Sequence, residues 1–172
     1  MWTDDTMLET LLKQGFEKLE LECDAQALSR YRTYYEYLEE INAVMNLTAI
    51  SGERDVAQLH FLDCAALLTA ADFRGKRVID VGSGAGFPGL PLKIACPDME
   101  LTLLDSLDKR VKFLKDCCEK MELRDVTCIH SRAEEAKGSG LDTANHQGRL
   151  GDPTHGGLDN GCAAPQTLGQ DS

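Results

Sequence analysis

The sequence predicts an α/β domain in which helices precede an incomplete parallel sheet. Three short apolar runs, at residues 77–79, 100–104 and 126–129, have the length and composition of buried strands. Segments between them carry apolar residues at three- and four-residue steps, which is typical of helices. A glycine-rich turn follows the first run, as it does where a strand leads into a helix beside a ligand.

The part of the chain before the first strand, residues 1–72, is expected to be helical. Residues 8–21 form a weakly amphipathic segment. In the next helix one face is apolar and is made of Leu28, Tyr31, Tyr35, Leu38, Ile41 and Met45. These tyrosines favour core packing over base stacking, because they share their face with aliphatic residues.

A further helix is expected to run through residues 56–67, capped by Ser51 or Asp55. His60 and Asp63 lie three residues apart in it and therefore share a face. Two interpretations stay open for them. They are either a partly buried polar pair or part of a surface that meets a nucleic acid.

The turn after the first strand has the sequence DVGSGAGFPG. An acidic residue at the strand end is followed by three alternating glycines: Asp80, Gly82, Gly84 and Gly86. Glycine is needed in such a turn because a Cβ would block both positive φ angles and the approach of a ligand. A dinucleotide-binding turn would have glycine or alanine where this chain has Phe87.

This acidic strand end and G-x-G-x-G pattern resemble the first motif of class I S-adenosylmethionine (SAM) methyltransferases. The alternative is a purely structural turn, or a turn that binds another nucleotide. The resemblance implies a Rossmann-like sheet with SAM at its carboxyl edge, where Asp80, Gly82, Gly84, Gly86 and Phe87 would surround the cofactor.

A second carboxylate, Asp105, ends the second strand 23 residues after Gly82. That spacing is close to the roughly 20 residues at which an acid reaches a ribose in related sheets. A carboxylate suits two vicinal hydroxyls because it accepts several hydrogen bonds at once. The alternative is that Asp105 starts the following helix, although Ser106 or Asp108 could cap that helix instead.

The helix expected over residues 109–121 places several cations off its apolar stripe, among them Lys109 and Arg110. They form either a solvated helix face or a contact with RNA phosphates. The third strand leads into Ala133 and Glu134. The loop after this strand faces the ligand crevice in a sheet of this type, so these two residues are expected to border an adenine ring.

Five motifs occur along the chain in this order: Asn46 with Leu47 and Thr48, His60 with Leu62 and Asp63, the 80–92 stretch, Leu104 with Asp105, Lys109 and Arg110, and Arg132 with Ala133 and Glu134. Taken together, they resemble the RsmG (GidB) family of bacterial 16S ribosomal RNA guanine-N7 methyltransferases. The resemblance covers residues 25–136. It implies SAM as cofactor, and 16S rRNA or the small ribosomal subunit as partner.

The resemblance also implies roles for single residues. Gly82 and Phe87 would line the SAM pocket, and Asp105 would hold the ribose. Ala133 and Glu134 would meet the adenine, and the helix that carries His60 would lie beside the crevice that RNA enters. It further implies a cytoplasmic protein.

Residues 137–172 differ sharply in composition from the rest of the chain. They contain eight glycines and two prolines, but no aromatic residue and no Val, Ile or Met. Such a segment cannot bury enough apolar surface to offset the entropy lost on ordering. We therefore predict a partial SAM-binding domain at 73–136, followed by a disordered or out-of-frame tail at 137–172.

A methyltransferase of this class has about seven strands, and this chain supplies the first three. The change of composition near residue 136 indicates a C-terminal truncation or a shifted reading frame. The outer edge of the first strand would then be unpaired, which predicts low stability or self-association. The alternative function is a catalytically inactive SAM-binding fragment.

The composition argues against a metal-binding protein, a membrane protein and a strong RNA-binding protein. The seven cysteines have no metal-binding spacing and fit buried thiols in a reducing cytosol, so we expect no metal. No segment predicts a membrane span or a signal peptide, so we expect no membrane. A net charge of −11 argues against strong RNA binding by this chain alone.

The expected chemistry requires no general base. N7 of guanine has an in-plane lone pair and can attack a sulfonium methyl group without first losing a proton. Alignment of the reacting atoms and exclusion of water would provide catalysis, so no catalytic residue is predicted. A third class, a nucleotide-dependent dehydrogenase, conflicts with the position of Phe87.

Overall fold

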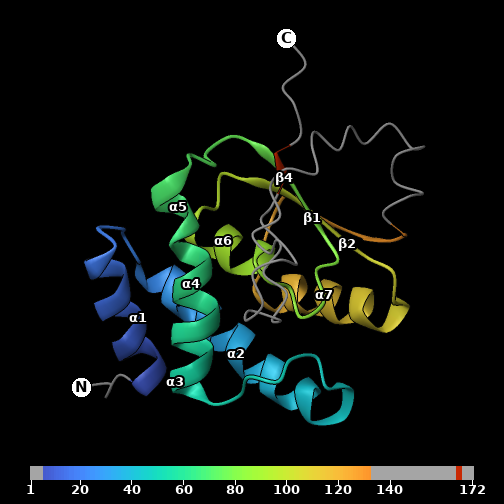
Figure 1. The fold of residues 1–172 in the computed structure, drawn as a ribbon, viewed down its shortest axis with the longest axis horizontal. Coiled ribbons are helices and arrows are strands. Elements are labelled where there is room, and N and C mark those ends of the chain that lie inside the picture. The colour runs from blue at the N-terminus through green and yellow to red at the C-terminus, as the bar shows by residue number, and fades with distance from the viewer. Residues whose placement is uncertain (1–5, 133–165, 168–172) are drawn as a thin grey trace, which may run out of the picture.

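The sheet has the strand order β3-β2-β1-β4. The strands are β1 (Arg77–Val81), β2 (Glu100–Asp105), β3 (Val126–His130) and β4 (Gln166–Thr167). The computed structural model describes residues 6–132 and 166–167 (Figure 1). β1 pairs in parallel with β2, and β2 pairs in parallel with β3. The predicted three-stranded parallel sheet is therefore confirmed.

The structure corrects one part of the prediction. The tail was expected to contain no strand and to leave the outer edge of β1 unpaired. Instead β4 pairs antiparallel with β1, opposite Val78 and Ile79. The rest of residues 137–172, like Ala133 and Glu134, lies outside the described residues.

Two helices connect the parallel strands, α6 (Gly89–Ala95) and α7 (Asp108–Lys120). Successive strand side chains point to opposite faces of the sheet. Val78, Leu101 and Leu103 therefore join the main core with α6 and α7, whereas Ile79 and Leu104 form a small separate cluster with Val81.

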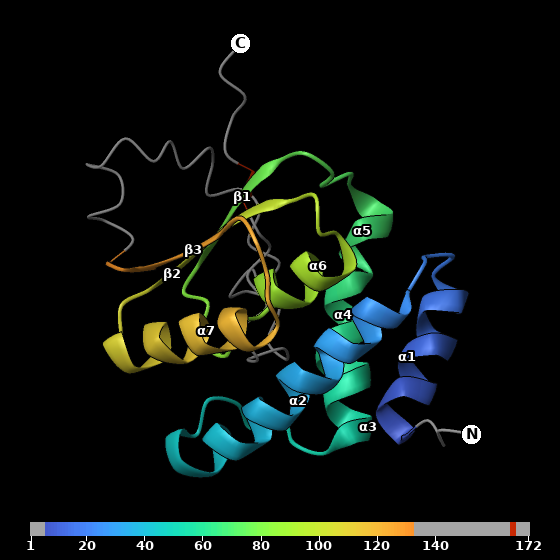
Figure 2. The same ribbon diagram turned by 180° about the vertical axis from the view of Figure 1, so that it is seen from behind.

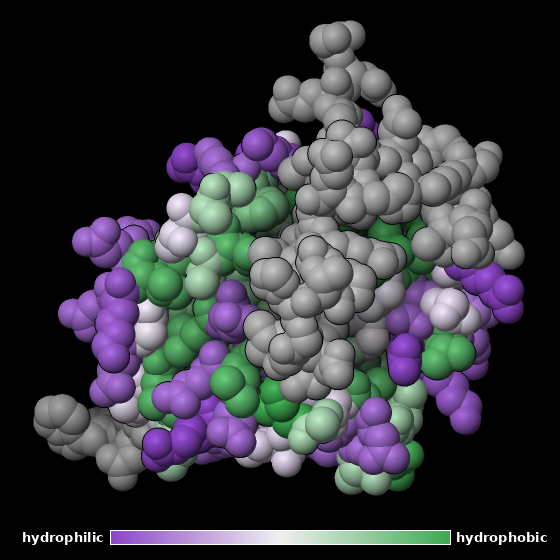
Figure 3. All heavy atoms as spheres, viewed as in Figure 1, coloured by the Kyte–Doolittle hydropathy of each residue, from purple (hydrophilic) through white to green (hydrophobic). Residues whose placement is uncertain are grey.

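The N-terminal helices are α1 (Met7–Lys18), α2 (Ala25–Met45), α3 (Glu53–Asp55), α4 (Leu62–Ala65) and α5 (Leu67–Ala70). A π-helix, η1 (Val56–Phe61), lies between α3 and α4. Both ribbon views show these helices beside the sheet, with α6 between them and the strands (Figure 1, Figure 2). Many hydrophilic residues lie along their outer side (Figure 3).

The predicted helix caps are met only in part. Asp55 occupies the N-cap position of η1 but makes no side-chain capping bond, and Gly52 rather than Ser51 is the N-cap of α3. The N-cap of α7 is Leu107, not Ser106 or Asp108. The helix predicted through 56–67 begins as the π-helix η1, because the spacing of apolar residues does not distinguish α- from π-helical hydrogen bonding. None of the helices in the described part of the chain is long and apolar enough to cross a bilayer.

Aromatic rings join the N-terminal helices to the glycine turn. Tyr34 of α2 stacks on Phe61 at 5.4 Å between ring centroids, and lies 5.8 Å from Phe87. The Tyr34 hydroxyl donates to the carbonyl of Ala85, and the Tyr31 hydroxyl donates to that of Pro91 at 2.8 Å. The predicted packing role of the tyrosine stripe is confirmed, although Tyr34 rather than Tyr35 is fully buried.

The predicted boundary between an N-terminal helical region, residues 1–72, and a partial SAM-binding domain, residues 73–136, stays a prediction. One hydrophobic core contains side chains from both segments, including Phe61 and Leu90. The helices and the sheet therefore share buried surface.

A buried carboxyl fixes the start of α6. Asp80 is fully buried, and its Oδ2 accepts the N–H of Gly89 at 3.0 Å. Burial raises the pKa of Asp80 to about 8. Its Oδ1 has no hydrogen-bond partner, so the protonated form suits this site better than the charged form.

The stability of the fold should depend on pH through Asp80. Between its ordinary pKa of 3.8 and about 8, the folded chain holds a proton that the unfolded chain has lost, so stability falls as pH rises through this window. We expect the unfolding free energy of the natural chain, minus that of Asp80→Asn, to decrease from pH 4 to pH 8 and then to level off. Urea denaturation at each pH measures it. A difference that does not change with pH would contradict the buried, protonated carboxyl.

Gly86 is required by packing. It has φ +100°, and a Cβ there would lie 2.5 Å from Tyr34 Oη and 2.7 Å from Leu90 Cδ1. We expect Gly86→Ala to cost about 2–5 kcal/mol of stability, combining left-handed strain with overpacking. Gly75→Ala is the matched control, since Gly75 has φ +69° with nothing within 4 Å. It should cost only about 1–2 kcal/mol. Equal losses in urea denaturation would rule out the steric explanation.

Candidate functional site

The candidate site is a cavity of about 310 Å³ at the carboxyl end of β1. Its lining comes from the loop after α2, from η1, from the glycine turn and from α7: Asn46, Leu47, Thr48, Ala49, His60, Gly82, Ser83, Gly84, Ala85, Phe87 and Arg110. Sequence motifs that are far apart in the chain therefore meet in one place. In parallel α/β sheets this edge is where ligands bind.

Gly82 and Gly84 provide the open floor of the cavity. They have φ +74° and +57°, and a Cβ on Gly82 would meet nothing within 4 Å. A side chain at either position would be strained and would project into free space that a ligand can fill. Gly86 is buried and does not line the cavity, so its predicted contact with the cofactor stays a prediction.

The N–H groups of the turn are already used within the chain. Gly82 and Ser83 donate to the carbonyl of Leu104 at 2.7 and 3.2 Å, and Gly84 donates to Asp105 at 2.9 Å. The N–H of Gly89, at the start of α6, donates to Asp80. These four N–H groups are therefore not free to bind a ligand.

Asp105 holds the turn and the start of α7 together. Its Oδ2 accepts from Gly84, and its Oδ1 accepts the N–H of Leu107 at 2.9 Å. The side chain is only 1% exposed and does not line the cavity. Neither of the two roles considered for Asp105, binding a ribose or starting the following helix, describes this arrangement fully. Asp105 precedes the N-cap of α7, and a ribose could reach it only after local rearrangement.

His60 and Phe87 form a wall of the cavity. Their rings stack at 3.9 Å between centroids with an interplanar angle of 11°. His60 is 2% exposed, and its Nε2 lies 3.0 Å from Thr48 Oγ1. Asp63, its predicted partner, is exposed. His60 is therefore held by the loop after α2 and by the glycine turn.

Burial also sets the charge of His60. It lowers the pKa of His60 to about 4, so the ring is neutral at pH 7. Its Nδ1 is buried and has no hydrogen-bond partner. The ring belongs to a π-helix, a rare structure that is frequent at functional sites. These features make the wall apolar apart from one unpaired nitrogen.

Of the two predicted RNA-binding cations of α7, only Arg110 lines the cavity. Its Nη1 lies 3.8 Å from Asp105 Oδ2, and its side chain is 40% exposed. Lys109 is exposed and lies outside the cavity lining. Arg110 can therefore meet an anionic group at the mouth of the cavity, whereas Lys109 faces solvent.

The loop at Asn46, Leu47, Thr48 and Ala49 was not among the predicted site residues. Asn46 ends α2 in the left-handed conformation with φ 49°, and Thr48 N–H donates to Asn42 Oδ1 at 2.9 Å. Asparagine is one of the few residues that adopt this conformation readily. The Asn-Leu-Thr string therefore signals a sharp turn, but its direction depends on tertiary packing.

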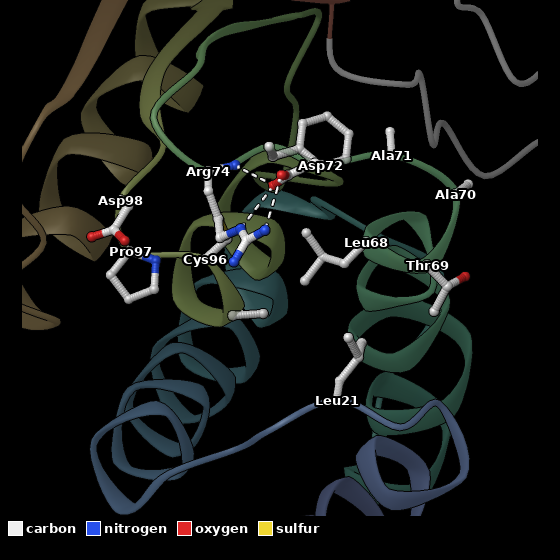
Figure 4. A pocket seen from close by; sticks show the side chains of 12 residues that line it. Leu21, Leu68, Thr69, Ala70, Ala71, Asp72, Arg74, Cys96, Pro97 and Asp98 are labelled. Atoms are coloured by element: carbon white, nitrogen blue, oxygen red, sulfur yellow. Dashed lines mark hydrogen bonds and ion pairs between the residues drawn. The ribbon is translucent and has the colours of Figure 1, made fainter.

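A larger cavity of about 650 Å³ lies at the opposite end of the strands (Figure 4). It is lined by the segments that precede β1 and β2 and by Leu21 and Leu68. Arg74 and Asp72 pair with each other at its rim, with both side chains more than half exposed. We place the functional site at the smaller cavity, because the predicted motifs converge there and the carboxyl edge is the usual ligand edge.

A family model described as GidB, rRNA small subunit methyltransferase G, matches residues 27–146. A protein of Lachnoclostridium phytofermentans named Ribosomal RNA small subunit methyltransferase G is 43% identical over 123 residues, which are 71% of this chain and 51% of that protein. One of the same name from Alkaliphilus oremlandii is 45% identical over 129 residues, 74% of this chain and 54% of that protein. The chain thus spans about half the length of these curated relatives.

Among solved structures, the chain is similar to a putative protein-L-isoaspartate O-methyltransferase from Plasmodium falciparum, solved in complex with S-adenosyl-L-homocysteine. The TM-score is 0.48 at 18% identity, over 80% of this chain and 71% of that one. A similarity at this level carries no argument about the site. The family match is different in kind, because it covers more than half of the sequence, including the glycine turn, His60 and Arg110. The chain belongs to the GidB family, rRNA small subunit methyltransferase G.

Proposed function

We propose that this chain contains the SAM-binding half of an enzyme that methylates N7 of a guanine in 16S rRNA. The observation that carries the proposal is the convergence of Gly82, Gly84, Phe87, His60 and Arg110 on one cavity. The family match supports the same assignment. Since the chain spans about half of its relatives, the activity, the RNA substrate and the ribosomal partner are all part of the proposal.

The cavity suits part of a SAM molecule. The open space over Gly82 and Gly84 admits a ligand close to the backbone, and Phe87 with His60 offers a flat wall. Arg110 is placed to pair with an anionic group. The roles of Asp80, Gly86, Asp105, Ala133 and Glu134 as cofactor contacts remain proposals. For Asp105 the role requires exchanging a bond to Gly84 or Leu107 for a ribose hydroxyl.

SAM supplies an electrophilic methyl group on a sulfonium. Guanine N7 needs no base, so the protein has to position the nucleophile and exclude water. A buried, neutral His60 is compatible with this chemistry, because near pH 7 it carries no additional proton that could be transferred to N7 of guanine. Together with Arg110 and Lys109 it is the proposed RNA-contacting set.

The second candidate is a catalytically inactive fragment that still binds SAM. The half-length match favours it, because about half of each relative has no match in this chain. SAM binding is common to both candidates, and methyl transfer separates them.

Saturable binding of SAM to the 172-residue chain is the expected result of isothermal titration. Gly82→Leu should weaken it by at least about tenfold, because the side chain would fill the space over the turn. Gly75→Leu is the control, since Gly75 shares the positive φ and open surroundings but lies outside the cavity. Similar losses in both variants would show general destabilisation. Binding that Gly82→Leu leaves unchanged would place SAM elsewhere.

Transfer of a labelled methyl group from SAM to small ribosomal subunits lacking guanine-N7 methylation is the test of activity. We expect labelled rRNA that cleaves at one guanine after borohydride and aniline treatment. Arg110→Ala should lower this yield more than Lys109→Ala, because only Arg110 lines the cavity. Intact SAM binding with no labelled RNA would select the inactive fragment. Label on other atoms would reject N7 chemistry.

Other predictions stay proposals. They are a cytoplasmic location, independence from metals and membranes, and self-association through the outer part of the β1 edge. In the described residues, β4 covers that edge only at Val78 and Ile79. The same residues include no group of three His, Cys, Asp or Glu side chains that could hold a metal ion.

A further inference from the structure

His60 carries a buried ring nitrogen that the described residues leave without a hydrogen-bond partner. The ring lines the cavity of the candidate site and is 2% exposed. Phe87 stacks on it at 3.9 Å between ring centroids. Nε2 is paired with Thr48, but Nδ1 has no partner. Buried polar atoms without a partner are rare and costly, so one in the wall of a cavity points to a ligand that supplies the missing bond.

The hydrogen bonds of Thr48 indicate which ring nitrogen carries the proton. Burial lowers the pKa of His60 to about 4, so the ring holds a single N–H proton at pH 7. Thr48 Oγ1 lies 3.0 Å from His60 Nε2 and accepts the N–H of Ile50 at 3.2 Å. Among the described residues, the Thr48 hydroxyl proton has no acceptor other than Nε2.

Two arrangements of these protons can be compared. If the Thr48 hydroxyl donates to Nε2, the proton of the ring is on Nδ1, and Nδ1–H is the one group left unpaired. If Nε2–H donates to Thr48 instead, both the Thr48 hydroxyl proton and the Nδ1 lone pair lack a partner. The first arrangement satisfies more groups, and the hydrogen bond at one ring nitrogen sets the tautomer, so Nδ1 is the donor.

An N–H donor at this place distinguishes the two purine bases. The major-groove edge of guanine presents two acceptors, N7 and O6, whereas adenine presents the acceptor N7 and the donor N6–H₂. A donor that reaches O6 leaves the N7 lone pair free to attack a methyl group. Opposite adenine, the same donor would meet a second donor, and both would be buried without a partner.

We propose that His60 is a specificity-determining residue, whose Nδ1–H donates to O6 of the target guanine and so selects guanine over adenine. The inference rests on the proposed function, since it concerns the base that the same site would methylate. Thr48 is the positioning residue, because its hydroxyl holds the proton of the ring on Nδ1. Nδ1 is buried, so the bond forms only when the base displaces part of the wall or the ring turns.

The tautomer can be measured without any substrate, by nitrogen NMR on the full 172-residue chain with isotope-labelled histidine at pH 7. The signals of His60 are those that disappear in His60→Gln. We expect a proton on Nδ1 and none on Nε2, the reverse of the tautomer that free histidine favours. Thr48→Val removes the hydroxyl and should shift the proton toward Nε2, whereas the matched control Thr48→Ser should keep it on Nδ1. A proton on Nε2 in the natural chain would overturn the proposal.

Base selection is measured by titrating the SAM-loaded chain with guanosine and with 2-aminopurine riboside, which is guanosine without O6. Guanosine should bind about threefold to tenfold more tightly, the effect of one hydrogen bond between neutral groups, and should shift the Nδ1 signal of His60. His60→Gln places its amide near Thr48 rather than at Nδ1, and should abolish this preference. His60→Asn places its amide near the position of Nδ1, and should retain part of it.

The outcomes separate this inference from the proposed function. If the chain binds SAM and guanosine, but His60→Gln keeps the preference or the Nδ1 signal does not respond, His60 does not read O6 and the proposed function stands. Guanosine that does not bind to the SAM-loaded chain would also overturn the inference. A chain that binds neither SAM nor guanosine would overturn both. If a variant fails to fold, the tautomer of the natural chain and its response to guanosine decide.

Discussion

The closure of the glycine turn onto the end of β2 is the interaction on which the site depends. The carbonyl of Leu104 accepts two N–H groups of the turn, and the neighbouring Asp105 carboxyl accepts a third while its other oxygen holds the start of α7. These bonds give partners to the backbone donors of the turn and of the segment that leads into α7. They also fix the turn relative to α7, and so bring Arg110 to the same cavity as Gly82 and Gly84.

The N-terminal helices complete the same site. Tyr34 and Phe61 pack beneath the turn, and His60 stacks on Phe87 while contacting Thr48. The wall of the cavity therefore combines His60, from before the first strand, with Phe87 of the glycine turn, and Gly82 and Gly84 of the same turn form the floor. The family match likewise begins at residue 27, well before the glycine turn.

Local patterns were enough to predict the three parallel strands, the helices α2 and α7 and the glycine turn. The spacing of apolar residues and the glycines of a turn are properties of residues close together in the sequence. Local patterns were not enough for contacts between distant segments. The partner of His60 is Thr48 rather than the nearer Asp63, because the π-helix changes the phase of the helix face. The pairing of β4 with β1 was missed because two residues have no detectable period. The burial of Asp105 depends on the turn that folds over it, which no single segment encodes.

The carboxyl of Asp80, in β1, accepts the N–H of the first residue of α6. In many nucleotide-binding turns the first N–H groups of the helix bind a phosphate. Here a side chain of the protein takes the N–H of Gly89, and the turn donors of Gly82, Ser83 and Gly84 are taken as well. A pyrophosphate would meet no free donor at these four positions. A phosphate could use these four donors only if bonds within the chain were broken first.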